Sequence, residues 1–311
     1  MASCFSMVAF YGYFLRRSFA AAGLRPETHE IDGGETTMHC WVPDSALGGS
    51  DDSRPTVVLL HGFGPSAVWQ WRRQVGHISR GLRLVVPDLV FFGGSSSRSA
   101  RRSVAFQAEC VLKLLDRLGV GRFSVVGTSY GGFVAWHVAR EAAPAGRVER
   151  VVIASSDPLK TEEDDAQLRQ RAGVENISDL MLPRSTRTLR SLLRLSVHRS
   201  PSIMPDFVLR DVLQTFFTDN REVKMELLEG LELNKNGEIS GSPLLQDVLI
   251  VWGEHDYIFP LEKAHLLKKH LGEKARLEVM KNTAHVPQIE DPNRFNEIVL
   301  NFLLGKPISS L

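Results

Sequence analysis

The chain has little cysteine, almost no net charge and no long apolar run, and each lack excludes a class of protein. Its three cysteines, Cys4, Cys40 and Cys110, lie far apart and in no metal-ligand spacing, so we expect buried free thiols in a reducing compartment and no metal. Lysine and arginine number 37 against 36 aspartates and glutamates. This balance gives no reason to expect a nucleic-acid partner.

The stretch CFSMVAFYGYFLRR at 4–17 is apolar for about a dozen residues, whereas a membrane span takes roughly 20. Its arginines follow the apolar run, while a secretory signal has basic residues before it. No acidic residue precedes Glu27, which leaves a transit peptide as an alternative. We expect a helix whose apolar stripe packs on the body of the protein or rests on a membrane surface. The stripe comprises Met7, Phe10, Tyr11 and Phe14.

These features favour a cytoplasmic protein, with plastid, peroxisome and membrane surface as alternatives. The peroxisomal alternative depends on the final SSL, which lacks the basic middle residue of the S-K-L signal.

Short runs rich in β-formers alternate with helical stretches over most of the chain. The expected strands are 37–43, 56–60, 82–88, 123–127, 148–154, 246–253 and 275–280, the first of them in a hairpin after an Asp-Gly-Gly turn. After the hairpin the runs are continuously apolar, as in strands buried on both faces. The expected helices lie around 68–80, 102–118, 132–142, 260–271 and 291–304. The β-α-β alternation predicts an α/β fold with a doubly wound, mostly parallel eight-stranded sheet.

The alternation breaks once, between about Asp157 and Ser242, where charged and leucine-rich stretches replace strands. An insertion at this point lies over the carboxyl ends of the strands, where ligands bind in open α/β sheets, so we expect a helical lid. The predicted division is an apolar and basic segment at 1–26, a core at 27–156 and 243–311, and a helical cap at 157–242.

The residues Gly127-Thr128-Ser129-Tyr130-Gly131 join an expected strand to an expected helix. This G-x-S-x-G pattern is typical of a nucleophile elbow, in which glycines two positions before and after the serine remove side chains that would clash in a sharp turn. We therefore predict that Ser129 is a nucleophile.

A serine hydroxyl needs a base, and the base needs an orienting acid. Asp256 follows the strand at 246–253, and His285 follows the next strand. The order Ser129, Asp256, His285 is that of an α/β-hydrolase triad. Three alternatives stay open: Asp256 as a helix cap, His285 as a plain loop histidine, and His255 or Asp157 as the real partner.

The segment HGFG at 61–64 directly follows the strand at 56–60. Backbone N–H groups of Phe63 and of Tyr130, the residue after the nucleophile, are the expected oxyanion-hole donors. His61 is expected to be a structural hydrogen-bonding residue.

With HGFG, GTSYGG, GEHD, AHVPQIEDP and the PDLVFFGGS segment at 87–95, the chain resembles the α/β-hydrolase superfamily from about residue 30 onward. It is similar to capped plant-type serine hydrolases and, more distantly, to meta-cleavage-product C–C hydrolases and monoacylglycerol lipases. The resemblance implies that Asp88 braces loops. It also argues against epoxide hydrolase and haloalkane dehalogenase activity, since those enzymes use aspartate at the elbow.

The expected function is cofactor-independent cleavage of a carboxylic ester of a small to medium apolar substrate, aromatic or lipid-like, through an acyl-enzyme on Ser129. C–C bond hydrolysis of the meta-cleavage type and a hormone-type receptor that retains the triad are the alternatives. In the expected cap, a basic amphipathic helix carries Arg187, Arg190 and Arg194. This face is expected to be solvated. The alternatives are that it holds an acidic substrate, or that it or the N-terminal segment makes peripheral membrane contact.

Overall fold

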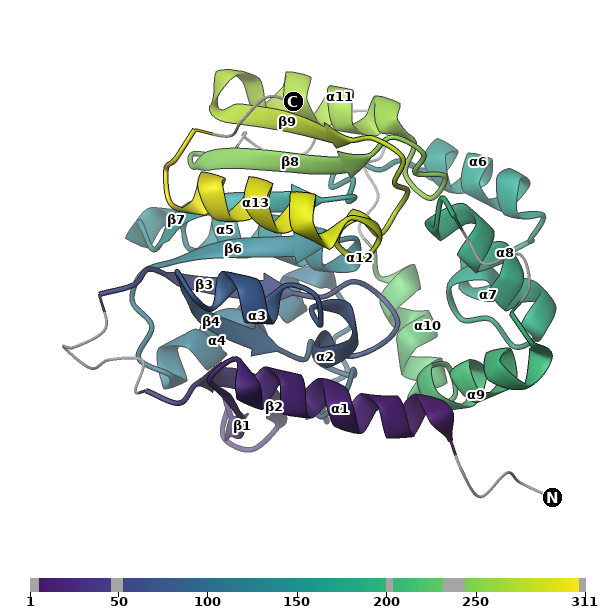
Figure 1. The fold of residues 1–311 in the computed structure, drawn as a ribbon, viewed down its shortest axis with the longest axis horizontal. Helices are drawn as coiled ribbons and strands as arrows, with labels where there is room; N and C mark the ends of the chain where they lie inside the picture. Colours follow the sequence, from purple (N-terminus) through teal and green to yellow (C-terminus); the bar gives the residue numbers. More distant parts are fainter. Residues whose placement is uncertain (1–5, 46–52, 200–203, 232–243, 308–311) are drawn as a thin grey trace.

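A computed structural model describes residues 6–45, 53–199, 204–231 and 244–307. Cys4 and the final SSL lie outside these ranges. The sheet runs in the order β1-β2-β4-β3-β6-β7-β8-β9, and a ninth strand, β5, pairs with β2 (Figure 1). The strands are β1 (Leu24–Glu30), β2 (Thr36–Pro43), β3 (Thr56–Leu60), β4 (Arg83–Pro87), β5 (Ser96–Ser97), β6 (Phe123–Thr128), β7 (Val148–Ala154), β8 (Asp247–Gly253) and β9 (Ala275–Met280).

The predicted mostly parallel, doubly wound sheet is confirmed, and the two-residue strand β5 makes it nine-stranded where eight strands were expected. From β4 through β9 all neighbours are parallel, while β1, β2 and β5 form the antiparallel part. Every residue of β3 is buried, with Val57 and Leu59 in one core and Val58 and Leu60 in the other, because successive side chains of a strand point to opposite faces. Covering both faces explains why the strand sequences are continuously apolar.

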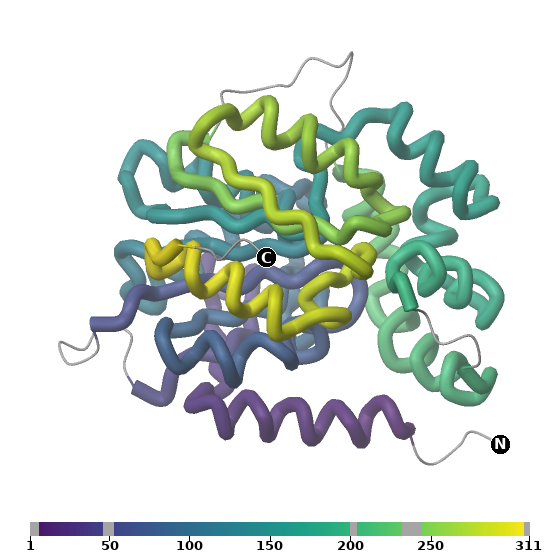
Figure 2. The backbone as a smooth tube through the Cα atoms, turned by 45° about the horizontal axis from the view of Figure 1, so that its top comes forward, coloured from purple at the N-terminus to yellow at the C-terminus, as the bar shows by residue number. Residues whose placement is uncertain are grey.

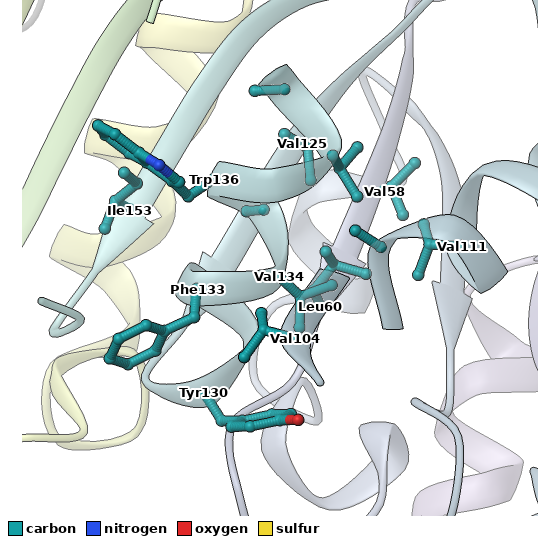
Figure 3. Close-up of a cluster of buried hydrophobic side chains, with 14 of the residues drawn as sticks. Val58, Leu60, Val104, Val111, Val125, Tyr130, Phe133, Val134, Trp136 and Ile153 are labelled. Carbon is teal, nitrogen blue, oxygen red and sulfur yellow. The ribbon is translucent and has the colours of Figure 1, made fainter. Parts of the chain in front are cut away.

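Helices cover the two faces of the sheet in separate layers (Figures 1 and 2). One layer contains α4 (Val104–Arg117), α5 (Tyr130–Glu141) and α11 (Leu261–Leu271). The other contains α1 (Met7–Ala21), α2 (Ala67–Gln70), α3 (Val75–Ile78) and α13 (Pro292–Leu303). In the first layer, Phe133, Val134 and Trp136 of α5 lie among core residues of β3, β6 and β7 (Figure 3). This packing holds the amino end of α5 against the carboxyl ends of the strands.

Two expectations need correction. The single helix expected at 68–80 is two short helices, α2 and α3, because the chain turns at Trp71, whose ring is fully buried. In α1 the stripe that packs on the body is not the expected one. It consists of Val8, Gly12, Leu15 and Phe19. The residues Met7, Phe10, Tyr11 and Phe14 are 41–53% exposed.

Among the described residues between β7 and β8 there are five helices: α6 (Glu162–Ala172), α7 (Ile177–Met181), α8 (Thr186–Ser196), α9 (Asp206–Phe216) and α10 (Arg221–Glu229). We call them the inserted helices. They gather at the carboxyl ends of the parallel strands (Figure 1). Local sequence sets where they begin: Thr161 and Asp164 form a capping box before α6, and Ser185 and Thr188 form one before α8. A small apolar cluster of their own includes Leu182, Leu189, Leu209 and Phe217.

Candidate active site

Ser129 lies at the turn between β6 and α5 with φ 51° and ψ −121°, a backbone conformation that L-residues rarely adopt. Neighbouring glycines make this turn possible. A Cβ atom at Gly127 would lie 2.1 Å from the Gly131 carbonyl oxygen, and one at Gly131 would lie 2.3 Å from the Leu60 carbonyl oxygen. The serine is held in place by its backbone N–H, which donates to the Ala154 carbonyl of β7 at 2.9 Å. The strained turn therefore presents the Ser129 hydroxyl at the carboxyl end of β6.

The structure brings the three predicted triad residues together. His285 Nε2 lies 2.9 Å from Ser129 Oγ, and His285 Nδ1 lies 2.9 Å from Asp256 Oδ2. The side chains of His285 and Asp256 are 7% and 0% exposed. With the imidazole neutral and its proton on Nδ1, Nε2 can accept the serine proton, which is the geometry of an activated serine.

The carboxylate of Asp256 is fixed by its own turn. Its Oδ1 accepts from the backbone N–H groups of Ile258 and Phe259, both at 2.9 Å, which leaves Oδ2 for the imidazole. Asp256 does not cap the following helix, because the N-cap of α11 is Pro260. His255 was the alternative partner for the nucleophile. Its ring stacks on the ring of His198, with centroids 4.2 Å apart.

Asp157, the other alternative acid, lies just after β7 and bonds the Leu159 N–H through Oδ1. Its Oδ2 is buried and has no hydrogen-bond partner among the described residues. Burial is the main cause that raises the pKa of Asp157 to about 6. In the described part of the chain, then, the acid that meets His285 is Asp256.

The two expected oxyanion donors flank Ser129. The Tyr130 N–H belongs to the first turn of α5, where backbone donors have no acceptor inside the helix. Phe63 lies in the loop after β3. Its neighbour Gly62 passes so close to the nucleophile that a Cβ there would lie 3.0 Å from Ser129 Cβ. The loop that carries Phe63 therefore runs beside the nucleophile, and Tyr130 follows the nucleophile directly in the chain.

Gln70 holds the loop that carries Phe63, a role that the sequence did not predict. Its Oε1 accepts from the Gly62 N–H at 2.8 Å, and its Nε2 donates to the carbonyls of Gly62 and Pro65 at 2.9 and 3.2 Å. One amide side chain therefore clamps both sides of the loop that carries Phe63. The sequence signal for this role is weak, because a glutamine in a short helix has no distinguishing pattern.

His61 and Asp88 support this region without meeting the nucleophile. His61 Nδ1 lies 2.8 Å from the Gly62 carbonyl, while Nε2 accepts from the Leu89 N–H at 2.9 Å. This pattern requires the neutral ring, and burial lowers the pKa of His61 accordingly. Asp88 accepts from the N–H groups of Ala67 and Gly94 and from His39. Burial would raise the pKa of Asp88, but the His39 hydrogen bond and the nearby donors outweigh it and lower the pKa.

Two cavities meet at Ser129 and share the side chains of Phe63 and Met181. The larger has a volume of about 320 Å³, and its walls are mostly apolar side chains of the inserted helices and of the Trp69 region. The smaller has about 30 Å³ and lies toward Phe133 and Phe259. A reacting carbonyl at Ser129 would therefore have unequal space on its two sides.

Trp69 lines the larger cavity and also contacts the outer helix α1. Its ring packs edge-on against Phe216 of α9, with centroids 4.9 Å apart, and is tilted against the ring of Tyr11 of α1, with centroids 5.5 Å apart. The close approach of α1 depends on Gly12, where a Cβ would lie 3.3 Å from Trp69 Cζ2. One indole ring thus contacts α1, α9 and the cavity.

The two cysteines in the described ranges are buried free thiols, with pKa values raised to about 12 by burial, so neither supplies a nucleophile. None of the helices in those ranges is long and apolar enough to cross a bilayer.

The model of the alpha/beta hydrolase fold family matches residues 55–292, and the chain belongs to this family. It is a hydrolase of the α/β fold.

Among characterised relatives, epoxide hydrolase 3 of Xenopus tropicalis is 26% identical over 92% of this chain and 82% of its own length. The 2-hydroxy-6-oxo-6-phenylhexa-2,4-dienoate hydrolase of Burkholderia cepacia is 27% identical over 79% of this chain and 87% of its own.

Solved structures share the fold. A membrane phospholipase A described as a bacterial virulence factor superposes with a TM-score of 0.75 at 22% identity, over 96% of this chain and 91% of the other. The 2-hydroxy-6-oxo-6-phenylhexa-2,4-dienoate hydrolase from Rhodococcus sp. strain RHA1 gives 0.70 at 24% identity, over 89% and 98%.

Proposed function

We propose that this protein is a serine hydrolase that cleaves a carboxylic ester of an apolar compound through an acyl-enzyme on Ser129. The observation that carries the proposal is the continuous hydrogen-bonded chain from Ser129 Oγ through His285 to Asp256, placed where two cavities meet. We further propose that residues 157–242 act as a cap over this site, as the position of the inserted helices supports.

The chemistry follows from the positions of the protons. His285 Nε2 takes the Ser129 proton while Oγ attacks the ester carbonyl carbon, and the resulting oxyanion accepts from the N–H groups of Phe63 and Tyr130. Asp256 keeps the Nδ1 proton in place and stabilises the imidazolium. The C–O bond then breaks, and Nε2 returns the proton to the leaving alkoxide. Water repeats the sequence to release the acid and free Ser129.

The cavities support an ester with two unequal halves. The larger has room for an aromatic or short lipid-like group and contacts it through Leu192, Phe216 and Val286. The smaller has room for a group of one or two carbon atoms. We therefore propose a bulky apolar half on the side of the inserted helices and a small half beside Phe133.

Substitution Ser129→Ala tests the proposal. Hydrolysis of an aryl acetate and labelling by a fluorophosphonate probe are both expected to be lost, with kcat falling by about 10⁴-fold or more. Ser196→Ala is the matched control, because Ser196 lines the same cavity without meeting His285. A Ser129→Ala variant that is folded and still turns over the ester would refute the proposal.

C–C bond hydrolysis is the alternative that the names of several relatives favour. The substrates so named are carboxylates, and Arg72 is the only lysine or arginine among the described residues lining the larger cavity. Its guanidinium already donates to the Trp69 carbonyl. We therefore prefer the ester. Comparing turnover of an aryl ester with that of a phenyl-substituted dienoate separates the two reactions.

A receptor that retains the triad is the second alternative. It predicts single-turnover or very slow kinetics together with a ligand-induced rise in Tm, whereas the hydrolase predicts many turnovers per site. Burst kinetics and thermal unfolding on the same preparation distinguish them.

A further inference from the structure

The helix α1 has apolar residues all round, yet in the part of the chain that the structure describes one of its faces is buried and the opposite face is exposed. Val8, Gly12, Leu15 and Phe19 are buried against the body. On the opposite side Phe10, Tyr13 and Phe14 are 53%, 52% and 49% exposed. A helix that is apolar on every side is normally buried on every side, so packing within the chain does not explain the outer aromatics.

The aromatics of α1 continue onto the inserted helices. Asp211 of α9 accepts from the Val8 N–H at 2.8 Å, which holds the first turn of α1 against α9. Phe207 lies one helical turn before Asp211 on the same side of α9 and is 60% exposed. The amino-terminal end of α1 lies beside α9 in both views of the molecule (Figures 1 and 2). We call Phe10, Tyr13, Phe14, Arg17 and Phe207 the aromatic surface.

The charges beside these rings are basic. Arg17 donates to the Tyr13 hydroxyl at 3.2 Å, and Arg16 precedes it on the helix. No acidic residue occurs before Glu27 in the sequence. On α9, Asp206 pairs with Arg190, and Asp211 is engaged by α1. Exposed aromatics with arginine and no free carboxylate in α1 are the composition of a helix that lies in the interface of an anionic bilayer.

We propose that the aromatic surface docks this protein on an anionic lipid bilayer, with α1 lying parallel to the membrane plane. The rings would enter the boundary between headgroups and acyl chains, and Arg16 and Arg17 would remain at the level of the phosphates. A second copy of the chain fits less well. A two-fold contact through this helix would bring the arginines of both copies together without a carboxylate from either α1.

The position of the surface gives docking a structural consequence. Tyr11 of α1 contacts Trp69, and Trp69 lines the larger cavity. A docked α1 would therefore hold the wall of that cavity beside the bilayer, where apolar compounds partition.

The test is sedimentation with vesicles of phosphatidylcholine containing about 30 mol% phosphatidylserine, compared with phosphatidylcholine alone. Full-length protein is expected to bind the anionic vesicles, and Tyr13→Ser/Phe14→Ser is expected to lower the partition coefficient about tenfold or more. The matched control is Leu245→Ser/Leu266→Ser, two exposed leucines that lie away from α1 and should leave binding unchanged. Thermal unfolding of each variant checks that the loss is not a folding defect.

Charge and alternative occupants are tested with the same vesicles. Arg17→Glu is expected to weaken binding to anionic vesicles more than to neutral ones. Arg187→Glu/Arg194→Glu on α8 is expected to bind like the parent protein, and loss in that variant alone would overturn the proposal. So would sedimentation velocity showing a dimer of the parent that Tyr13→Ser/Phe14→Ser dissociates. Because binding is the readout, the result does not depend on whether Ser129 is catalytic.

Discussion

The strand ends and the inserted helices face each other across the same cavity, but different interactions hold them. At the strand ends, Ser129, His285 and Asp256 are each fixed by hydrogen bonds of 2.9 Å. The inserted helices contribute mainly apolar side chains, such as Leu189 and Leu192, to the opposite wall. Directional bonds tolerate little change, whereas apolar contacts tolerate repacking. We therefore expect chemistry to be sensitive to the first region and selectivity to the second.

The largest expected effect on kcat comes from a substitution at the strand ends, Asp256→Asn. In Asp256→Asn the amide NH₂ would face His285 Nδ1 and move the ring proton to Nε2, which could then no longer accept the serine proton. We expect kcat to fall about 10⁴-fold. Steady-state kinetics with an aryl acetate measure it, and Asp116→Asn, at an exposed pair with Arg147, is the control. Activity within about tenfold of the parent would contradict the assigned role.

Asp157 lies between β7 and the inserted helices and does not contact His285. A substitution there should therefore change stability and leave the chemistry unchanged. Its folded-state pKa is raised to about 6, so folding disfavours its ionised form. Stability should fall as pH rises from about 4 through about 6. Asp157→Asn should remove this loss, gaining up to about 3 kcal/mol in the free energy of unfolding at pH 7.5 and nothing near pH 4.

Urea unfolding of both proteins at the two pH values measures this difference, and activity of Asp157→Asn should match the parent. An Asp157→Asn variant that loses turnover like Asp256→Asn would mean that the wrong acid has been assigned.

Gln70 extends the hydrogen-bonded region to the oxyanion loop. Gln70→Leu keeps the size of the side chain and removes its three hydrogen bonds to the Gly62 and Pro65 backbone. We expect kcat to fall about 30-fold, less than for full loss of an oxyanion donor, with KM little changed. Gln70→Glu retains the acceptor for the Gly62 N–H and should recover part of the rate. If KM rises while kcat is constant, Gln70 acts on substrate binding through the cavity that it lines and not by positioning the loop.

The smallest effect concerns the inserted helices. Leu192→Ala enlarges the larger cavity, so kcat/KM for an ester with a bulky apolar half should fall about tenfold, while a small ester is unaffected. Ser191→Ala on the same helix is the control. Equal losses on both esters would indicate that the inserted helices position the chemistry as well.

Much of the sheet was predictable because β3, β4, β6, β7 and β8 are mostly buried, so each is a run of mainly apolar residues in the sequence. The runs at 56–60, 148–154 and 275–280 match β3, β7 and β9. The meeting of Ser129, Asp256 and His285 followed from their places after strands, since parallel strands end at one edge. Their catalytic roles remain a prediction.

Other features depend on contacts that no local pattern records. The Gln70 clamp needs the path of the loop at 62–65, and the break between α2 and α3 needs the buried position of Trp71. The stripe of α1 that packs on the body was not the expected one, because Gly12 has no side chain to mark a contact face, although its smallness is what admits Trp69. The other alternative for the expected stripe, contact with a membrane surface, stays a prediction.

That glycine links an outer helix to the shape of the cavity. A larger residue at position 12 would place its Cβ 3.3 Å from the Trp69 ring, so the ring would have to move by a few tenths of an ångström. A change on the periphery would then alter which compounds fit without touching a reacting group. Natural variants that differ at this one position should differ in preference among esters while sharing one rate for the smallest of them.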